Sequence, residues 1–140
     1  MAKTIDDAIV AVRTLVRAIS GIRSAPAGVP ENDSGIYPFF VAWNGGGELN
    51  AADDSWERGL WTITCQLHFK RTDLWRAEAY ASPYARTVAR ALIADHTLTG
   101  TCDTFGRILI SPLKPMAWGD VQTIGYEFTI EQVKIIESRS

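Results

Sequence analysis

The chain has 140 residues, of which 46% are hydrophobic and 21% are charged, and its formal net charge is −2. This length suits a single domain with a buried core, and the near-neutral charge argues against general binding to nucleic acid or to a membrane surface. Two cysteines form no disulfide framework, no apolar run reaches the ~20 residues of a membrane span, and the acidic N-terminus is unlike a signal peptide, so we expect folding in a reducing cytoplasm with both thiols free.

Residues 4–20 carry the clearest pattern, that of an amphipathic helix. Thr4 is a suitable N-cap, Asp6 and Asp7 lie at the positive end of the helix dipole, and Gly21 is suited to end the helix. One apolar stripe recurs at three- and four-residue spacing and predicts the buried face: Ile5, Ala8, Ile9, Val12, Leu15, Val16 and Ile19. The following residues, 21–37, are rich in Gly, Pro, Ser and Ala and predict an ordered crossover or a flexible arm.

Two strands and a long loop are predicted next. Residues 37–43 form a short apolar run, and Pro38 places its start at a sheet edge. Residues 44–58 contain three consecutive glycines and a mostly polar remainder, which predicts a long, mobile loop. Residues 59–70 alternate as a half-buried antiparallel strand does, with His68 on the polar face and these residues on the apolar face: Trp61, Ile63, Cys65, Leu67 and Phe69.

The second half predicts one helix between strands. Asp73 is suited to cap a short helical turn over residues 74–77, and Ser82 with Pro83 begins a central helix that runs to about Asp95. The inner stripe of this helix is Tyr84, Val88, Ala91 and Leu92, with Ala81 nearby. A strand follows around residues 108–110, ended by Pro112 and Pro115. In the last strand, residues 121–136, the alternation slips by one residue, which predicts a β-bulge near Glu131 and Gln132.

The order of these elements is helix, strand, strand, helix, strand, strand. It predicts an α+β fold, a mostly antiparallel sheet of about four strands with the N-terminal and central helices packed on one face. We expect residues 1–140 to form a single domain with a flexible loop at about 44–58.

No pattern of catalytic or metal-binding residues stands out. Cys65 and His68 lie three apart on a strand, so their side chains point to opposite faces and cannot share a metal; a packed thiol beside an exposed imidazole is the alternative. Residues 45–47 lack the Lys-Ser/Thr of a phosphate loop and predict a flexible hairpin tip. A Ser–His–Asp site assembles in space, so the sequence leaves it open. We expect no enzymatic activity, no cofactor and no metal.

Five tryptophans are a high count for this length. Trp43 and Trp56 bracket the predicted loop, and Trp118 lies in another connection. Tryptophan outside a core is enriched at interface hot spots; the alternative for each ring is to cap an end of the sheet core. A homo-oligomer whose loop reaches a neighbouring subunit would explain both the loop and the rings.

Polar residues complete the set of candidate interface residues. Asp53 and Asp54 are adjacent acids in the predicted glycine-rich loop. Such acids are usually solvated, and binding of a divalent ion there is a remote alternative. Two arginines four apart on the outer face of the central helix form either a solvated surface or a docking patch for an acidic partner or a nucleic-acid backbone. The full set is Trp43, Asn50, Asp53, Asp54, Trp56, Arg58, Arg86, Arg90 and Trp118.

Several segments together resemble the tail terminator, or tail-completion, proteins of long-tailed bacteriophages. They are the N-terminal helix with its end at residues 19–22, the Pro-containing segment 25–31 that leads into 37–41, the strand 61–68 after a glycine-rich loop, the helix start at 82–84, and the last strand at 125–131. The resemblance covers nearly the whole chain. It lies in the general pattern of these segments and includes no invariant sequence signature.

This resemblance implies a virion protein without enzymatic activity, assembled in the host bacterial cytoplasm. It implies a homohexameric ring that caps the tube of major tail protein, stops tube polymerisation and joins the tail to the head–tail connector, while genomic DNA passes through the ring without specific binding. It also implies that the glycine-rich loop, residues 44–58, orders on assembly. A neck or head-completion (stopper) protein is an alternative, and a small-molecule-binding α+β domain is an alternative of another class.

Overall fold

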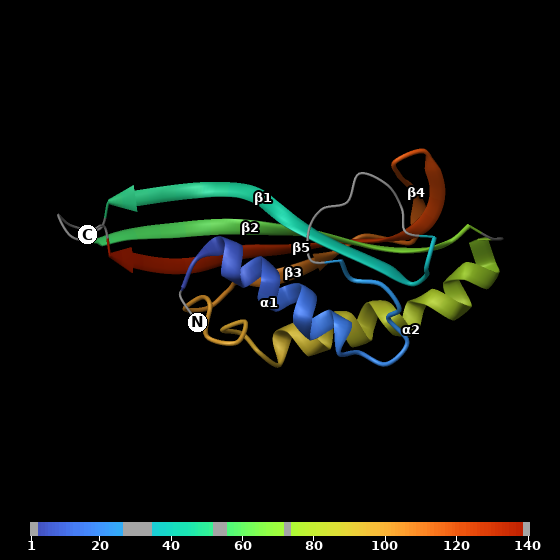
Figure 1. Cartoon of the computed structure of the whole chain (residues 1–140), viewed down its shortest axis with the longest axis horizontal. Helices are drawn as coiled ribbons and strands as arrows, with labels where there is room; N and C mark the ends of the chain where they lie inside the picture. The colour runs from blue at the N-terminus through green and yellow to red at the C-terminus, as the bar shows by residue number, and fades with distance from the viewer. Residues whose placement is uncertain (1–2, 27–34, 52–55, 72–73, 139–140) are drawn as a thin grey trace.

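The computed structural model describes residues 3–26, 35–51, 56–71 and 74–138. Two helices and five strands follow one another as α1 (Ile5–Arg17), β1 (Phe39–Ala51), β2 (Trp56–Lys70), α2 (Leu74–Ile93), β3 (Arg107–Ile110), β4 (Lys114–Trp118) and β5 (Val121–Ser138). The strands form one antiparallel sheet in the order β1-β2-β5-β3, and β4 also pairs with β5. Both helices pack on the same face of this sheet (Figure 1). The predicted α+β class is confirmed, with one strand more than expected.

Helix α1 forms as its sequence predicts. The Thr4 hydroxyl accepts the N–H of Asp7 (3.1 Å between N and Oγ1), which satisfies one of the free donors of the first turn. Residues Ile5, Ala8, Ile9, Val12 and Val16 are buried, and Leu15 and Ile19 pack against them. Gly21 adopts a φ of 96°, in the left-handed region that glycine enters at little cost.

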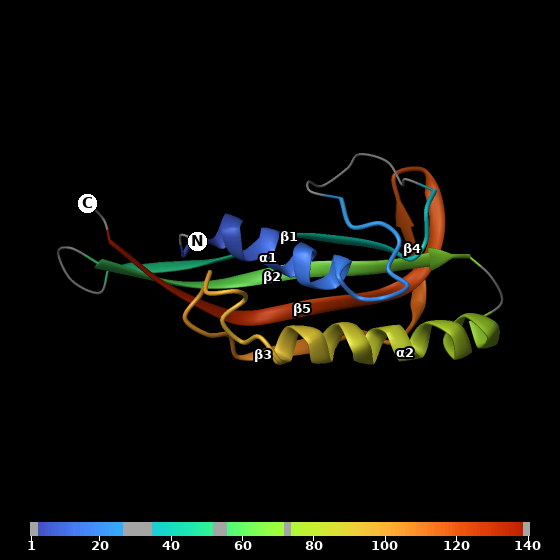
Figure 2. The same ribbon diagram turned by 60° about the horizontal axis from the view of Figure 1, so that its bottom comes forward.

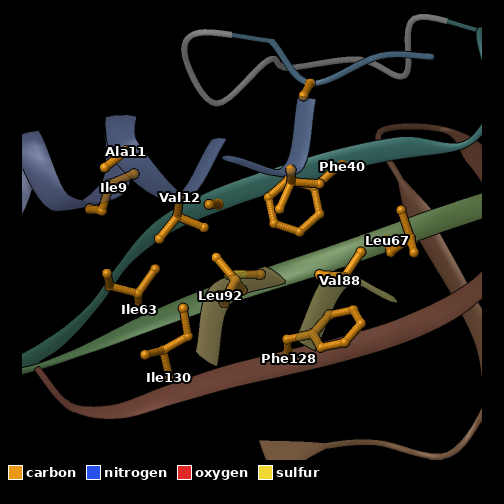
Figure 3. Close-up of a cluster of buried hydrophobic side chains, with 14 of the residues drawn as sticks. Ile9, Ala11, Val12, Phe40, Ile63, Leu67, Val88, Leu92, Phe128 and Ile130 are labelled. Carbon is orange, nitrogen blue, oxygen red and sulfur yellow. The ribbon is translucent and has the colours of Figure 1, made fainter. Parts of the chain in front are cut away.

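The main core lies between the two helices and the sheet. Figure 3 shows Val12 of α1 and Val88 and Leu92 of α2 directed toward side chains of β1, β2 and β5, among them Phe40, Leu67 and Phe128. All six side chains are fully buried. This covering of one sheet face explains the strict alternation of residues 61–69, in which Ile63, Cys65, Leu67 and Phe69 are buried and Trp61 packs against the core.

Helix α2 begins earlier than the sequence predicts. The prediction of a short turn at 74–77 and a new helix capped by Ser82 is wrong, because one helix spans Leu74–Ile93 with Pro83 inside it. Proline removes one helical hydrogen bond, but Pro83 lies on the exposed side, where water can solvate the freed carbonyl. The predicted inner stripe is confirmed, with Ala81, Val88 and Leu92 buried and Tyr84 and Ala91 half-buried.

Two bulges interrupt the long strands at the same level of the sheet. On β5, Glu131 and Gln132 stand opposite one residue of β2, and Gln132 has a φ of 58°, so the predicted bulge is confirmed. On β1, the register shifts between Asn44 and Gly47, also by one extra residue. Beyond both bulges the three strands continue together.

Strand β4 was not predicted. Pro115 was expected to end the preceding strand, but it pairs with Ile124 within β4, on an edge where its missing N–H costs no ladder bond. β4 curls out of the plane of the main sheet at the end opposite to the chain termini (Figures 1 and 2). No helix in the described ranges is both long and apolar enough to cross a membrane.

Candidate functional site: the projecting arm and the sheet edges

The segment predicted to be a long loop is for the most part a projecting arm of the sheet. β1 continues to Ala51 and β2 starts at Trp56, so the register runs without interruption from the Gly47–Trp61 pair to the Ala51–Glu57 pair. β5 pairs with the other side of β2 as far as the Trp56–Ser138 pair. Figure 1 shows these three strands extending past the start of α1. We call this extension, residues 47–51, 56–61 and 133–138, the arm.

The loop prediction for residues 44–58 is therefore wrong, and the reason lies in tertiary pairing. Glycine and polar residues disfavour strands when considered alone, but here two neighbouring strands supply a ladder. β1 has one residue more than β2 over this stretch, and the bulge between Asn44 and Gly47 accommodates it. At this bulge Gly46 has a φ of 97° and donates its N–H to Asn44 Oδ1 (2.8 Å). Of the predicted interface residues in this segment, Asp53 and Asp54 lie outside the described residues.

Exposed apolar side chains mark the arm. Leu49, Trp56 and Ile136 are 56%, 46% and 38% exposed. Leu49 pairs with Gly59 and so lies on the face that carries the helices elsewhere in the sheet, whereas Ile136 pairs with Arg58 on the opposite, uncovered face. The predicted residues Asn50, Trp56 and Arg58 thus come together on the arm's uncovered face, as an aromatic ring beside a cation and an amide.

The two sides of the arm differ in how their backbones are satisfied. On the β5 side, Asp103 N–H donates to Lys134 O (2.8 Å), Lys134 N–H donates to Thr104 O (2.8 Å), and Ile136 N–H donates to Asp103 Oδ2 (3.0 Å). Asp103 also accepts from Lys3 Nζ (2.8 Å). Burial alone would raise the pKa of Asp103, but the bonds from Lys3 and Ile136 and the charges of Lys3 and Lys134 together hold it below its usual value. The β5 side is therefore closed by a short segment of the chain.

The β1 side has no such cover. Phe40 N–H donates to Ser24 O (2.8 Å), and beyond this bond no backbone hydrogen bond joins the outer edge of β1 to the described part of the chain. An open strand edge carries unpaired donors and acceptors and is a template for another strand. Open backbone and exposed Leu49 and Trp56 occur on the same hairpin, so the arm is the strongest candidate for a binding surface.

Neither the family models nor the curated proteins that were compared with this sequence contain a match.

Trp43 and Trp118 have a different setting from Trp56. The Trp118 ring lies 5.7 Å from that of Trp43, 6.1 Å from Phe39 and 5.7 Å from His68, measured between ring centroids. Both tryptophans are half-buried: Trp118 is the last residue of β4, and its ring packs on Trp43 at the face of the sheet opposite the helices. This packing matches the alternative in which a tryptophan caps an end of the sheet core. The structure therefore gives these two rings a structural role.

The prediction that His68 is exposed is wrong. His68 is completely buried, with Nδ1 2.6 Å from Thr123 Oγ1 and Nε2 2.9 Å from Gln66 Oε1. Because Gln66 Oε1 can only accept, the bond at Nε2 requires a proton on that nitrogen. The strand pattern correctly put His68 on the face opposite the helices, but β4 folds over that face, and no pattern in the sequence indicated β4.

Arg86 and Arg90 lie exposed on α2, as predicted for its outer face. They belong to the helical layer, so the structure does not bring them together with the candidate residues of the arm (Figure 2). Among the described residues, neither arginine forms a salt bridge with an acidic side chain.

A shallow polar depression of about 550 Å³ lies beside the two bulges. Arg107 Nε donates to Glu131 Oε1 across it (2.6 Å), and Glu48, Thr62 and Gln132 form part of its lining. Within the described ranges, no group of three or more His, Cys, Asp or Glu residues is placed to hold a metal ion. Cys65 and Cys102 are buried, and burial raises the pKa of both thiols, that of Cys102 to about 11, which disfavours the reactive thiolate.

Sequence reasoning missed Leu109 and Ile110 of β3 as surface residues. They are 42% and 44% exposed, although their strand is a short apolar run that suggests burial. Adjacent residues of a strand point to opposite faces, so exposure of both means that neither face of this strand is fully covered. The short span of five residues between Gly106 and Pro112 was the available signal for an edge position.

Proposed function

We propose that this protein is a ring-forming structural subunit that caps a bacteriophage tail tube and joins it to the head–tail connector. The observation that carries the proposal is the arm, a strand extension with exposed Leu49 and Trp56 and an open backbone edge. Such a surface fits binding to protein, because strand edges and exposed aromatic rings are recognition elements for other chains. The resemblance of residues 19–22, 61–68 and 125–131 to tail terminators supports the choice of partner.

In the proposed function the protein acts through its contacts with other protein subunits. A cap needs contacts between subunits, to close a ring, and a surface that the last ring of tube protein can bind. A cyclic assembly uses two different surfaces of each subunit, because heterologous contacts close into rings when the rotation permits. The net charge of −2 suits passage of DNA through such a ring, since a strongly basic lining would retain the DNA electrostatically.

Tube polymerisation tests this proposal directly. The tail tube protein that the proposal requires as partner is polymerised with and without the purified chain, and tube lengths are measured by electron microscopy. We expect shorter tubes with the chain bound at one end, and a native mass that corresponds to a ring. A strict monomer that leaves tube length unchanged would contradict the proposal. Binding to the portal-side connector without an effect on tubes would instead indicate a stopper protein.

A further inference from the structure

The outer edge of β1 directs specific backbone groups away from the sheet. Phe40 N–H reaches outward to Ser24, and alternate residues of a strand direct their backbone groups to the same side. The backbone groups of Val41 and Trp43 are therefore directed toward β2, where these residues pair with Gln66 and Thr64. β2 itself has no extra residue here, so every second residue after Gln66 and Thr64 still directs its backbone groups toward β1. Among these residues, Leu60 pairs with Glu48 and Arg58 pairs with Asn50 beyond the bulge. The outward groups of the arm are those of Gly47, Leu49 and Ala51.

The outer edge of β3 lies at the other end of the main sheet and is open in the same way. Glu131 O accepts from Gly106 N–H (2.9 Å) and Glu127 O accepts from Ser111 N–H (2.9 Å), so these alternate residues of β5 face β3. Thr129 belongs to the same set and pairs with Leu109. Ile108 and Ile110 must then direct their backbone groups outward, where no backbone hydrogen bond to a described residue meets them.

The strand directions of the two edges are compatible with each other. Each neighbouring pair along β1-β2-β5-β3 is antiparallel, so β3 runs opposite to β1. When a copy of the sheet is placed beside the first by rotation about an axis to which the strands are tilted, as in closed sheets, its β3 comes next to β1, displaced along it toward the arm, and continues the antiparallel alternation. Figure 1 shows β1 and β3 on opposite sides of the sheet, as this arrangement requires.

The charges of the two edges are complementary. Within residues 42–51 of β1 the charged residue is Glu48, and within β3 it is Arg107, whose side chain is 69% exposed beside its own partner Glu131. Pairing β1 with a second β1 would place two copies of Glu48 on one short ladder, and pairing β3 with β3 would do the same with Arg107. Pairing of unlike edges avoids these like-charge contacts, while Arg107 keeps its partner Glu131 in its own copy.

We propose that the outer edge of β1 in one copy pairs antiparallel with the outer edge of β3 in a second copy of this chain. The pairing satisfies backbone groups of Leu49 and Ile110, covers Leu109 and Ile110, and brings Arg107 of one copy to the strand that carries Glu48 of the other. Because each copy offers one edge of each kind, the contact repeats around a ring and leaves no open edge. This inference rests on the self-association within the proposed function and identifies its surface.

Cysteine cross-linking tests the pairing and its faces. Leu49 and Ile110 lie on the helix-covered face, whereas Leu109 lies on the uncovered face. A Leu49→Cys chain is mixed with an Ile110→Cys chain under mild oxidation, alone and with tube protein, and mixed disulfide dimers are counted on a non-reducing gel. Ala51→Cys replaces Leu49→Cys in a second mixture, to cover a register shifted by two residues. The native cysteines contribute no background, since Cys65 and Cys102 are buried.

We expect mixed dimers from at least one of these mixtures, at several times the yield from Leu49→Cys with Leu109→Cys, whose thiols would lie on opposite faces. Disulfide formation by Leu49→Cys alone would show β1 paired with β1 and overturn the inference. Assembly without any of these cross-links would also overturn it and would leave the proposed function standing. Cross-links without an effect on tube length would overturn the proposed function alone, and a monomer under all conditions would overturn both.

A proline substitution gives a second, independent measurement. Leu49→Pro removes one outward N–H and leaves the β1–β2 ladder intact, because proline is accepted where a strand's N–H faces solvent. The matched variant Leu49→Thr keeps the N–H and shortens the side chain. We expect the proline variant to weaken self-association at least tenfold by light scattering, and the threonine variant to weaken it less. Equal association of Leu49→Pro and the wild type would contradict strand pairing at this edge.

Discussion

Strands β1, β2 and β5 run through two regions that are held together in different ways. In the body, α1 and α2 cover one face, and the side chains of Phe40, Leu67 and Phe128 are fully buried. At the base of the arm Val133 and Ile135 are still buried in the core, but toward its end Leu49 is more than half exposed. The body is therefore stabilised mainly by apolar burial, and the outer part of the arm mainly by its backbone ladder and by the segment at Asp103 and Thr104.

This difference separates what keeps the protein folded from what it offers to a partner. Elements with few buried contacts open more readily and tolerate substitution better than a packed core. A binding surface placed on the arm can change in sequence without loss of the body. Substitutions that affect one region and spare the other test this separation.

The largest expected effect is in the body. Phe128→Ala removes a completely buried ring and leaves a cavity between the sheet and α2, so we expect a loss of about 3–5 kcal/mol in the free energy of unfolding. Leu49→Ala on the arm should change it by less than about 0.5 kcal/mol in the monomer. Urea unfolding followed by circular dichroism measures both, and comparable losses for the two variants would contradict the division into body and arm.

Two glycines give the same comparison for backbone space. A Cβ at Gly125 would lie 1.9 Å from Leu67 O, a backbone atom of the neighbouring strand, so the ladder itself must move. A Cβ at Gly59 would lie 2.3 Å from Trp61 Nε1, the edge of a half-buried ring that can turn away. We expect Gly125→Ala to cost about 3 kcal/mol and Gly59→Ala about 1 kcal/mol. A smaller loss at Gly125 than at Gly59 would show that the central strands yield more easily than the arm.

A third comparison concerns two tryptophans that the sequence treats alike. Trp118→Ala removes a ring that packs on Phe39, Trp43 and His68, so we expect a loss of about 2 kcal/mol in unfolding free energy. Trp56→Ala should cost the monomer less than about 1 kcal/mol but impair assembly. Unfolding and native mass measurements on both variants separate the roles. Normal assembly of Trp56→Ala would remove this ring from the proposed interface.

The helices and central strands were predictable because each buries one side, and a side that is buried leaves a regular spacing of apolar residues in the sequence. The stripe of α1, the alternation of residues 61–69 and the slip at Glu131 and Gln132 each follow from local spacing and one covered face. The start of α2 was missed because Pro83 is a strong helix-start signal, yet its exposed position within a helix is tolerable.

The features missed from the sequence depend on distant pairing. Residues 44–51 become a strand because β2 lies beside them, and His68 is buried because β4 folds over it. The candidate site was predicted in part: Asn50, Trp56 and Arg58 share the arm, whereas Trp43 and Trp118 pack in the body, and Arg86 and Arg90 lie on α2. The open edges of β1 and β3 follow from strand order, which a single sequence does not encode locally.

The smallest expected effect concerns the anchor at the base of the arm and depends on pH. The pKa of Asp103 is held below its ordinary value by the bond from Lys3, the bond from Ile136 and the nearby lysines, which outweigh the opposing effect of burial. A carboxyl group whose pKa is lowered on folding adds stability that is fully present above its unfolded pKa and is lost as the pH falls through the folded value. Because Lys3 is 48% exposed, solvent screening keeps this contribution to about 1 kcal/mol or less.

Asp103→Asn should therefore lower unfolding free energy at pH 7 by about 1 kcal/mol, and this difference from the wild type should shrink as the pH falls below the ordinary carboxyl pKa. Amide exchange at Ile136, whose N–H donates to Asp103, should accelerate in the variant while amides of Leu67 and Phe128 keep their rates. Asp120→Asn, at an exposed carboxyl, is the matched control. If the stability difference persisted at acid pH, the charge of Asp103 would not be its cause. If Ile136 kept its exchange rate, closure of the β5 side would not depend on Asp103, and the asymmetry between the two sides of the arm would rest on the backbone bonds of Asp103 and Thr104 alone.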